Sequence, residues 1–212
     1  IVIEFAQNSD LNCFLTKKAN TLSWLEKLKL LYKISIGLNL IHQRKIIHRD
    51  LHSGNILISQ NSEPAIADLG ISKPVNESSD SIYGIIPYIA PEVFKERKFT
   101  EYSDIYSFGM IIWEVISGCR PFSDRKHDEY LILDILDGHR PKIPTNIPHE
   151  LVEFMEICWH QDPKKREQVF PNSIWNVREG YWEINLKNLS KEQKKEKYNF
   201  KKVKVQIFYN LK

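Results

Sequence analysis

The stretch His48-Arg49-Asp50-Leu51-His52-Ser53-Gly54-Asn55 decides how this chain is interpreted. Short apolar runs at 46–47 and 56–58 flank it and predict two small strands joined by a loop. Asp-Leu-Gly follows at 68–70, and Ala-Pro-Glu follows at 90–92. Any single acidic residue is most often a solvated surface group, so none of these motifs is decisive alone. Their joint occurrence, in this order and at these spacings, points to one site built from separate loops.

The charge of the chain is concentrated at its end. The 212 residues carry a formal net charge of +3, with 42% hydrophobic and 27% charged residues, as in ordinary globular proteins. Eight lysines lie between 187 and 204, and without the tail residues 1–186 carry about −4. A nucleic-acid-binding fold would gather its basic residues on the folded face, so we expect no nucleic-acid partner. For the Lys-rich tail, a solvated segment and a membrane-surface or nucleic-acid role are both open.

Three features predict the compartment. No run of 18 apolar residues exists, which excludes an ordinary transmembrane segment. Cys13, Cys119 and Cys158 are far apart and without metal-type spacing, which favours a reducing, cytoplasmic location over a disulfide framework. No signal peptide is visible, and the chain begins inside an apolar run, so we expect that a segment upstream of it is missing.

The first half of the chain predicts two helices before the strands. A brief helix begins near Asp10, with Ser9 or Asp10 as its N-cap. A long helical pattern over about 23–42 is apolar on several faces, which is typical of a central helix packed on more than one side. A further short apolar run at 65–67 predicts a third small strand.

The second half is predicted to be helical as well. Residues 105–116 are nearly all apolar and predict a buried helix, with Ser103 able to cap its start and Gly118 its end. Two amphipathic helices follow near 127–136 and 149–159. The sequence therefore predicts a mainly α body with a few short strands around the 48–55 loop. Residues 71–92 and 167–183 show no clear period.

The ordered motifs resemble the signature set of the protein kinases: the catalytic loop, the metal-binding Asp-Phe-Gly and the Ala-Pro-Glu anchor. The resemblance runs through residues 1–166 and implies the C-terminal lobe of the α+β kinase fold. It implies an end of N-lobe strand and hinge at 1–6, the lobe at 7–166, a divergent end at 167–186 and the tail at 187–212. ATP and Mg²⁺ are the implied cofactors, and a protein is the implied substrate. Neither the substrate's identity nor the oligomeric state follows from the sequence.

The resemblance assigns roles to the catalytic residues. Asp50 would accept the proton of the substrate hydroxyl. Asn55 and Asp68 would hold Mg²⁺ through hard oxygen ligands, and Gly70 would free the backbone for the turn after Asp68. His52 stands where Ser/Thr kinases usually carry a lysine that contacts the γ-phosphate, and it is a weaker cation at neutral pH.

The remaining family positions bind adenine or hold the lobe together. The residues implied at the adenine pocket are Ile3, Glu4, Ala6 and Leu57. The residues implied in the regulatory spine are His48, Leu69 and Asp104, and the implied ion pair joins Glu92 to Arg166. Asp104 would also bond the backbone of the catalytic loop, a reason for a carboxylate at the start of so apolar a helix. Compensation of the helix dipole is the alternative.

The segment between Asp68 and Glu92 would be the activation loop. Its candidate phosphorylation sites are Ser78, Ser79, Ser81 and Tyr83. Arg49 would be the usual receiver of such a phosphate. The alternative is that a Ser-rich loop is only flexible.

The motifs also indicate a subgroup. Trp113-Glu114 and Cys158-Trp159 look like those of tyrosine-kinase-like enzymes, and the catalytic loop lacks the Ala-Ala-Arg or Arg-Ala-Ala of true tyrosine kinases. This favours a Ser/Thr kinase of the tyrosine-kinase-like type. Ile85 replaces the threonine expected after Gly84, which leaves transfer to tyrosine open.

Two functional hypotheses follow. No Gly-rich phosphate loop, strand lysine or partner glutamate of the family's N-lobe is found in this sequence. The leading hypothesis is therefore a kinase catalytic lobe that is active only with an N-lobe, with an apolar surface around Phe5, Leu57 and Leu69 where that lobe would sit. The alternative is a non-catalytic kinase remnant that acts as a protein-interaction scaffold. A chance occurrence of the motifs in an unrelated helical domain is the third.

Overall fold

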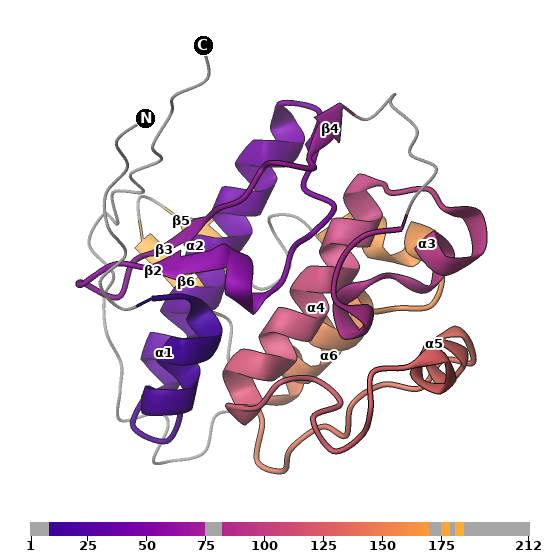
Figure 1. Cartoon of the computed structure of the whole chain (residues 1–212). Helices are drawn as coiled ribbons and strands as arrows, with labels where there is room; N and C mark the ends of the chain where they lie inside the picture. The colour runs from indigo at the N-terminus through magenta and orange to yellow at the C-terminus, as the bar shows by residue number, and fades with distance from the viewer. Residues whose placement is uncertain (1–8, 75–81, 170–174, 179–180, 185–212) are drawn as a thin grey trace.

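Two long helices organise the fold. The computed structural model describes residues 9–74, 82–169, 175–178 and 181–184 (Figure 1). Helix α2 (Trp24–Gln43) begins at a capping box in which Ser23 and Glu26 bond each other's backbone N–H groups, and it packs against α4 (Glu101–Ser117). Every residue of α4 from Ser103 to Ile116 is buried. The mainly helical fold and the central place of both helices are therefore confirmed.

The start of α4 corrects one sequence expectation. The N-cap is Thr100, not Ser103. The Thr100 hydroxyl accepts a bond from Ser103 N, and Ser103 Oγ accepts one from Thr100 N, so Ser103 is the third helical residue of a capping box. At the other end, Gly118 caps the helix as predicted, in the left-handed conformation at φ 74°.

The shorter helices surround α4. Helix α1 (Leu11–Lys18) is capped by Asp10, whose carboxylate accepts from Cys13 N. Helices α3 (Pro91–Glu96) and α5 (Glu129–Leu136) lie on the side of α4 away from α1, and α6 (His149–Cys158) packs along α4 (Figure 1). Helix α6 comes close because Gly109 has no side chain: a Cβ there would stand 3.0 Å from Cys158 Cβ. A single core results, built on α2, α4 and α6.

In the described residues, the strands form three two-stranded antiparallel ribbons. Strand β1 (Ile46–Ile47) pairs with β4 (Lys73–Pro74), β2 (Ile56–Ile58) with β3 (Pro64–Ile66), and β5 (Trp175–Arg178) with β6 (Tyr181–Ile184). Strands β1 and β2 flank the 48–55 loop, as the sequence predicts. The β5–β6 hairpin and the short β4 were not predicted. Among the described residues, no helix is long and apolar enough to cross a membrane.

Candidate active site

Helix α4 anchors the 48–55 loop through Asp104, near the start of the helix. Asp104 is 1% exposed, and its carboxylate accepts hydrogen bonds from His48 N at 2.8 Å and Arg49 N at 2.9 Å. His42 at the end of α2 makes a third contact, with Nε2 at 2.8 Å. Arg49 has φ 76°, a conformation that costs energy for a residue other than glycine. The hydrogen bonds that His48 N and Arg49 N donate to Asp104 offset that cost. The expected contact between this carboxylate and the loop backbone is therefore present.

Asp50 faces outward from this anchored loop with partners at both ends of its carboxylate. Asn55 Nδ2 donates to the Asp50 main-chain O at 2.8 Å and to Oδ2 at 3.3 Å, and His52 Nε2 stands 3.6 Å from Oδ1. The contact with His52 is the largest influence that holds the pKa of Asp50 below its ordinary value, against the opposing effect of partial burial. Asp50 is therefore an ionised, half-buried carboxylate that can accept a proton.

Asp68 lies beside Asn55 because the β2–β3 ribbon extends beyond its strands. Ala67 N donates to Asn55 O at 2.8 Å, and Ala67 O contacts His48 Nε2 at 3.0 Å. The next residue, Asp68, turns at φ 57° and accepts a bond from Gly70 N at 3.2 Å. The two loops predicted to share a ligand are thus joined by their backbones.

The donor set near Asn55 and Asp68 suits Mg²⁺. The Asn55 amide nitrogen is committed to Asp50, which leaves its oxygen for a ligand, and the Asp68 side chain is exposed. In the described part of the chain, no three His, Cys, Asp or Glu residues gather into a metal cluster. Mg²⁺ does not require such a cage, because it is usually held by one or two protein oxygens together with phosphates and water.

The segment before α3 reaches the catalytic loop. Gly84 has φ 115°, and a Cβ there would lie 3.2 Å from Asp50 Oδ1, so glycine allows this segment to touch the carboxylate. The next residue, Ile85, is 41% exposed, and Tyr83 before it is 49% exposed. Their side chains lie at the surface on the approach to Asp50.

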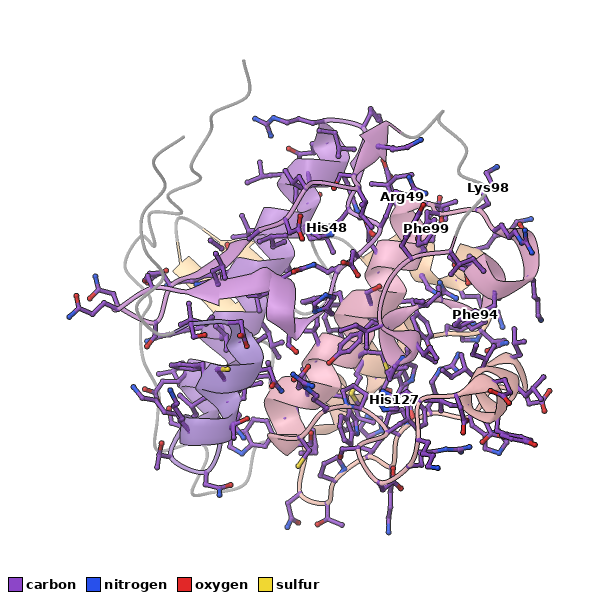
Figure 2. All side chains as sticks on the ribbon, viewed as in Figure 1. His48, Arg49, Phe94, Lys98, Phe99 and His127 are labelled. Atoms are coloured by element: carbon purple, nitrogen blue, oxygen red, sulfur yellow. The ribbon has the colours of Figure 1, made fainter. Side chains whose placement is uncertain are left out.

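Arg49 is buried rather than extended toward solvent. It is 6% exposed, and its guanidinium lies 4.7 Å from the centre of the Phe99 ring. Figure 2 labels the two residues side by side. Its Nη1 donates only a long bond to Ile71 O at 3.4 Å, and its Nε has no hydrogen-bond partner among the described residues. A cation whose Nε has no partner in the described part of the chain therefore lies beside Ile71.

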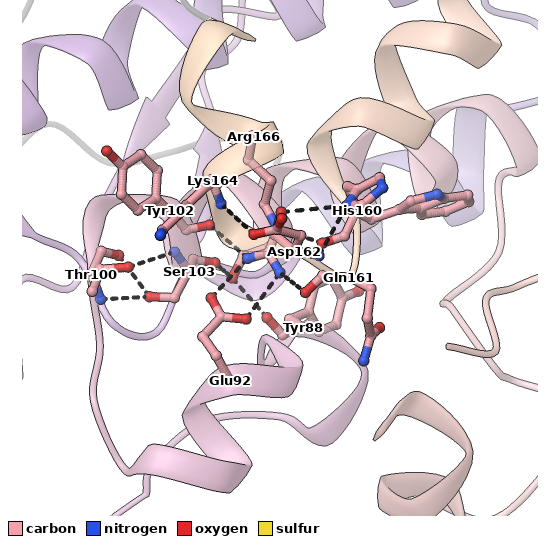
Figure 3. Close-up of polar contacts among 12 residues, drawn as sticks. Tyr88, Glu92, Thr100, Tyr102, Ser103, His160, Gln161, Asp162, Lys164 and Arg166 are labelled. Atoms are coloured by element: carbon pink, nitrogen blue, oxygen red, sulfur yellow. Dashed lines mark hydrogen bonds and ion pairs between the residues drawn. The ribbon is translucent and has the colours of Figure 1, made fainter. Parts of the chain in front are cut away.

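Glu92 and Arg166 form the ion pair that the resemblance implies. Arg166 is fully buried and donates through Nη1 and Nη2 to the two Glu92 oxygens, at 2.8 and 2.9 Å (Figure 3). It also donates to His160 O at 2.6 Å and Tyr102 O at 3.1 Å. The pair ties the 90–92 motif to α4 and to the chain after α6.

A second buried network was not predicted from the sequence. Tyr88 donates to Glu114 Oε2 at 2.5 Å, Asn12 donates to Oε1 at 3.0 Å, and the Tyr88 hydroxyl stands 3.4 Å from Ser53 Oγ in the catalytic loop. Burial raises the pKa of Glu114, which is 0% exposed, and also that of Tyr88. The one feature of the sequence that could have indicated this network is the presence of a glutamate within an apolar helix. Nothing in the sequence around Asn12 indicated that it would contact Glu114.

Of the other predicted positions, Leu57 and Leu69 are described by the structure and the rest are not. Leu57 is half-buried in β2 and Leu69 is 42% exposed, while Phe5, the third residue of the expected apolar surface, lies outside the described residues. The expected hinge and adenine residues before residue 9 (Ile3, Glu4, Phe5, Ala6), the candidate phosphorylation sites Ser78, Ser79 and Ser81, and the tail at 187–212 all lie outside the described residues.

Comparison with known sequences decides the family. Residues 1–171 match the family described as protein tyrosine and serine/threonine kinase. The chain belongs to the protein kinases. This kinase chain is 32% identical over 168 residues to the serine/threonine-protein kinase STY17 of Arabidopsis thaliana, and 33% identical over 173 residues to ephrin type-A receptor 7 of Gallus gallus. It is 34% identical over 185 residues to ankyrin repeat and protein kinase domain-containing protein 1 of Mus musculus.

The kinase chain is much shorter than these relatives. Each match covers 78% of the chain but only 30%, 17% and 24% of the respective relative. By family this is an enzyme, and kinases use ATP, a divalent metal and a protein substrate.

Proposed function

We propose that the chain supplies the C-terminal lobe of a Ser/Thr protein kinase, and that Asp50 accepts the proton of the substrate hydroxyl as the γ-phosphate of ATP is transferred. The observation that carries the proposal is the arrangement around Asp50. An ionised carboxylate sits on a loop anchored by Asp104, with Asn55 and Asp68 brought together beside it. Phosphoryl transfer depends mostly on positioning and electrostatics, so a rigid loop of this kind is what the reaction requires.

The chain's residues have distinct tasks in this proposal. The Asn55 amide oxygen and the Asp68 carboxylate would hold Mg²⁺, which neutralises phosphate charge when bound. Asn55 also orients Asp50, because its amide nitrogen bonds both the main chain and the side chain of that residue. Leu57 would form the floor of the adenine pocket.

A Gly-rich loop and a strand lysine in another part of the protein would complete the ATP site. The proposal therefore concerns the full-length protein, of which this chain is one lobe. The tyrosine-kinase-like subgroup and a cytoplasmic location belong to the same proposal. The location is supported by the free thiols of Cys13, Cys119 and Cys158.

Serine or threonine is proposed as the acceptor. The support is the sequence of the catalytic loop, which lacks the Ala-Ala-Arg or Arg-Ala-Ala of true tyrosine kinases. Arg49 is proposed to receive a phosphate on the activation loop, at a site such as Tyr83, because its Nε has no partner in the described structure and it lies at the base of that loop. A phosphate there would draw the loop toward the 48–55 loop.

The alternative function is a protein-interaction scaffold. The observation that favours it is the outer face of α5, where Tyr130 is 66% exposed and Leu133 is 55% exposed. Large apolar side chains at the surface are common at sites of protein contact.

The experiment measures transfer of labelled phosphate from ATP to a generic protein substrate by the full-length protein. We expect transfer to serine or threonine, read out by phosphoamino acid analysis. Asp50→Asn is expected to lower kcat by about 10²-fold or more, since a positioned base contributes about that much. The matched control Asp124→Asn changes an exposed carboxylate away from the loop and should leave kcat unchanged. Full activity in Asp50→Asn would remove the catalytic proposal, and absence of transfer in the unaltered protein would favour the scaffold.

A further inference from the structure

His52 does not point into solvent as a free cation would. Its Nδ1 accepts a hydrogen bond from Gly54 N at 3.0 Å, which makes His52 the N-cap of the short 3₁₀ turn η1 (Ser53–Asn55). A ring nitrogen that accepts a hydrogen bond must carry a lone pair. The proton of the neutral ring therefore sits on the other nitrogen, Nε2, and the loop's own backbone selects that tautomer.

The protonated nitrogen faces the catalytic carboxylate. Nε2 stands 3.6 Å from Asp50 Oδ1, and the His52 side chain is only 14% exposed. The ring of Tyr88, from η2 (Ile86–Tyr88), lies against the imidazole with centroids 6.0 Å apart. Asp50 and Tyr88 are thus the titratable groups observed around the imidazole, which is held by a backbone amide, a carboxylate and a tyrosine ring.

Gly54 is required for this placement because of space. A Cβ at Gly54 would lie 2.8 Å from His52 Cε1 and 3.0 Å from Nδ1, closer than atoms of this kind approach. The backbone of Gly54 is outside the left-handed region, so another residue could adopt its conformation. What a side chain would disturb is the imidazole, and His52 and Gly54 therefore act as a matched pair.

We propose that His52 is a positioning residue that acts as a neutral imidazole: Gly54 fixes its tautomer, and its Nε2–H orients the Asp50 carboxylate. The proposal rests on the proposed function, in which Asp50 takes the hydroxyl proton. Asp50 then has a neighbour on each side: Asn55 Nδ2 donates a hydrogen bond to Oδ2, and His52 Nε2 lies 3.6 Å from Oδ1. Each oxygen keeps a lone pair for the substrate. His52 thus differs from the lysine it replaces, because it contacts the base rather than supplying charge to the γ-phosphate.

The two roles predict different kinetic effects. A residue that orients Asp50 affects the transfer step, so its loss lowers kcat. A residue that contacts the γ-phosphate also binds ATP, so its loss raises KM for ATP.

The first test reads the tautomer directly and needs no catalysis. Long-range ¹H–¹⁵N correlation spectra of the labelled 212-residue chain are recorded from pH 5 to 8, and His52 is assigned by the signals lost in His52→Gln. We expect the neutral ring to be protonated at Nε2 alone, and Gly54→Ala to convert it to a mixture of tautomers while the other spectra stay dispersed. A wild-type mixture, or protonation at Nδ1, would overturn the proposal.

The second test measures the consequence for transfer in the full-length protein. Asn can present an oxygen to Gly54 but has no donor that reaches Asp50, whereas Gln can place a donor near the Nε2 position. We expect kcat to fall about tenfold in His52→Asn and Gly54→Ala, with KM for ATP unchanged, because a misplaced base slows the reaction without weakening nucleotide binding. His52→Gln should retain most of kcat.

The split between kcat and KM separates the two roles. We expect the exposed control His139→Gln to leave both kcat and KM for ATP unchanged. A raised KM for ATP in His52→Asn would show that His52 contacts phosphate and would refute the positioning role. If no variant and no unaltered protein transfers phosphate, the proposed function fails, and the tautomer measurement still decides how His52 is held.

Discussion

The buried pair of Glu92 and Arg166 holds the first turn of α3 against the chain after α6. We consider Glu92→Gln, which keeps the shape of the side chain and removes its charge. Arg166 is 0% exposed and Glu92 is 11% exposed, so the variant leaves a guanidinium in the interior without its counter-charge. Breaking such a pair from one side costs about 3–5 kcal/mol.

We expect the loss of stability to be at the lower end of that range, because backbone carbonyls around Arg166 still accept hydrogen bonds from it. Arg166 still donates to His160 O and Tyr102 O, so part of its hydrogen bonding survives. We expect a loss of about 3 kcal/mol in the free energy of unfolding, or about 6–12 °C in Tm for a chain of this size. The assay is urea unfolding followed by tryptophan fluorescence and circular dichroism.

Two controls make the prediction decisive. Glu153→Gln removes an exposed i,i+4 contact with His149 and should cost no more than about 0.5 kcal/mol. On the background of Arg166→Met, Glu92→Gln should cost much less than in the wild type, since no buried cation remains. Equal costs on both backgrounds, or a single-variant cost below about 1 kcal/mol, would refute the ion pair as a source of stability.

Two further predictions concern buried groups. Burial raises the folded-state pKa of Glu114, so its contribution to stability is complete below about pH 4.5, its ordinary value, and is lost as pH rises through the raised pKa. The stability of the wild type relative to Glu114→Gln should therefore fall from pH 4.5 to pH 8 in urea unfolding, and a difference independent of pH would contradict this. Gly118→Ala is strained at φ 74° and would place its Cβ 2.6 Å from Ala19 Cβ, whereas Gly138→Ala at φ 94° meets no atom within 4 Å. Gly138→Ala should lower the free energy of unfolding by about 1 kcal/mol, and Gly118→Ala by about 1–3 kcal/mol more because of overpacking. Equal Tm values for the two variants would show that the contact with Ala19 relaxes without loss of stability.

Much of the helical fold could be predicted because its signals are local. The predicted helices at 23–42 and 149–159 match α2 and α6 within one residue at each end, since caps and apolar spacing act over a few residues. The cap of α4 could not be chosen in this way. Thr100 and Ser103 are both hydroxyl residues that can cap a helix, and the difference lies in where the chain turns from the extended conformation of Thr100 into the helix.

The catalytic motifs could be predicted for a different reason, their order along the chain. The spacing of the 48–55, 68–70 and 90–92 motifs was enough to indicate the kinase family. Spacing did not reveal the contact of Tyr88 with Glu114, because the partners are 26 residues apart and the network includes Asn12, 102 residues from Glu114. Such pairs depend on the packing of several elements around α4.

By itself, the sequence determined the family, the main helices and the identity of the residues that meet at Asp50. The tertiary structure alone decided how those residues act. Arg49 is recognisable as a cation from the sequence, but only the structure shows it buried against Phe99 with an Nε that has no partner among the described residues. The sequence places a histidine at position 52, and only the tertiary structure shows that its Nδ1 accepts a hydrogen bond from the Gly54 N–H. The physical reason is that charge and hydrogen-bonding state depend on distances of a few ångström, which are set by the fold.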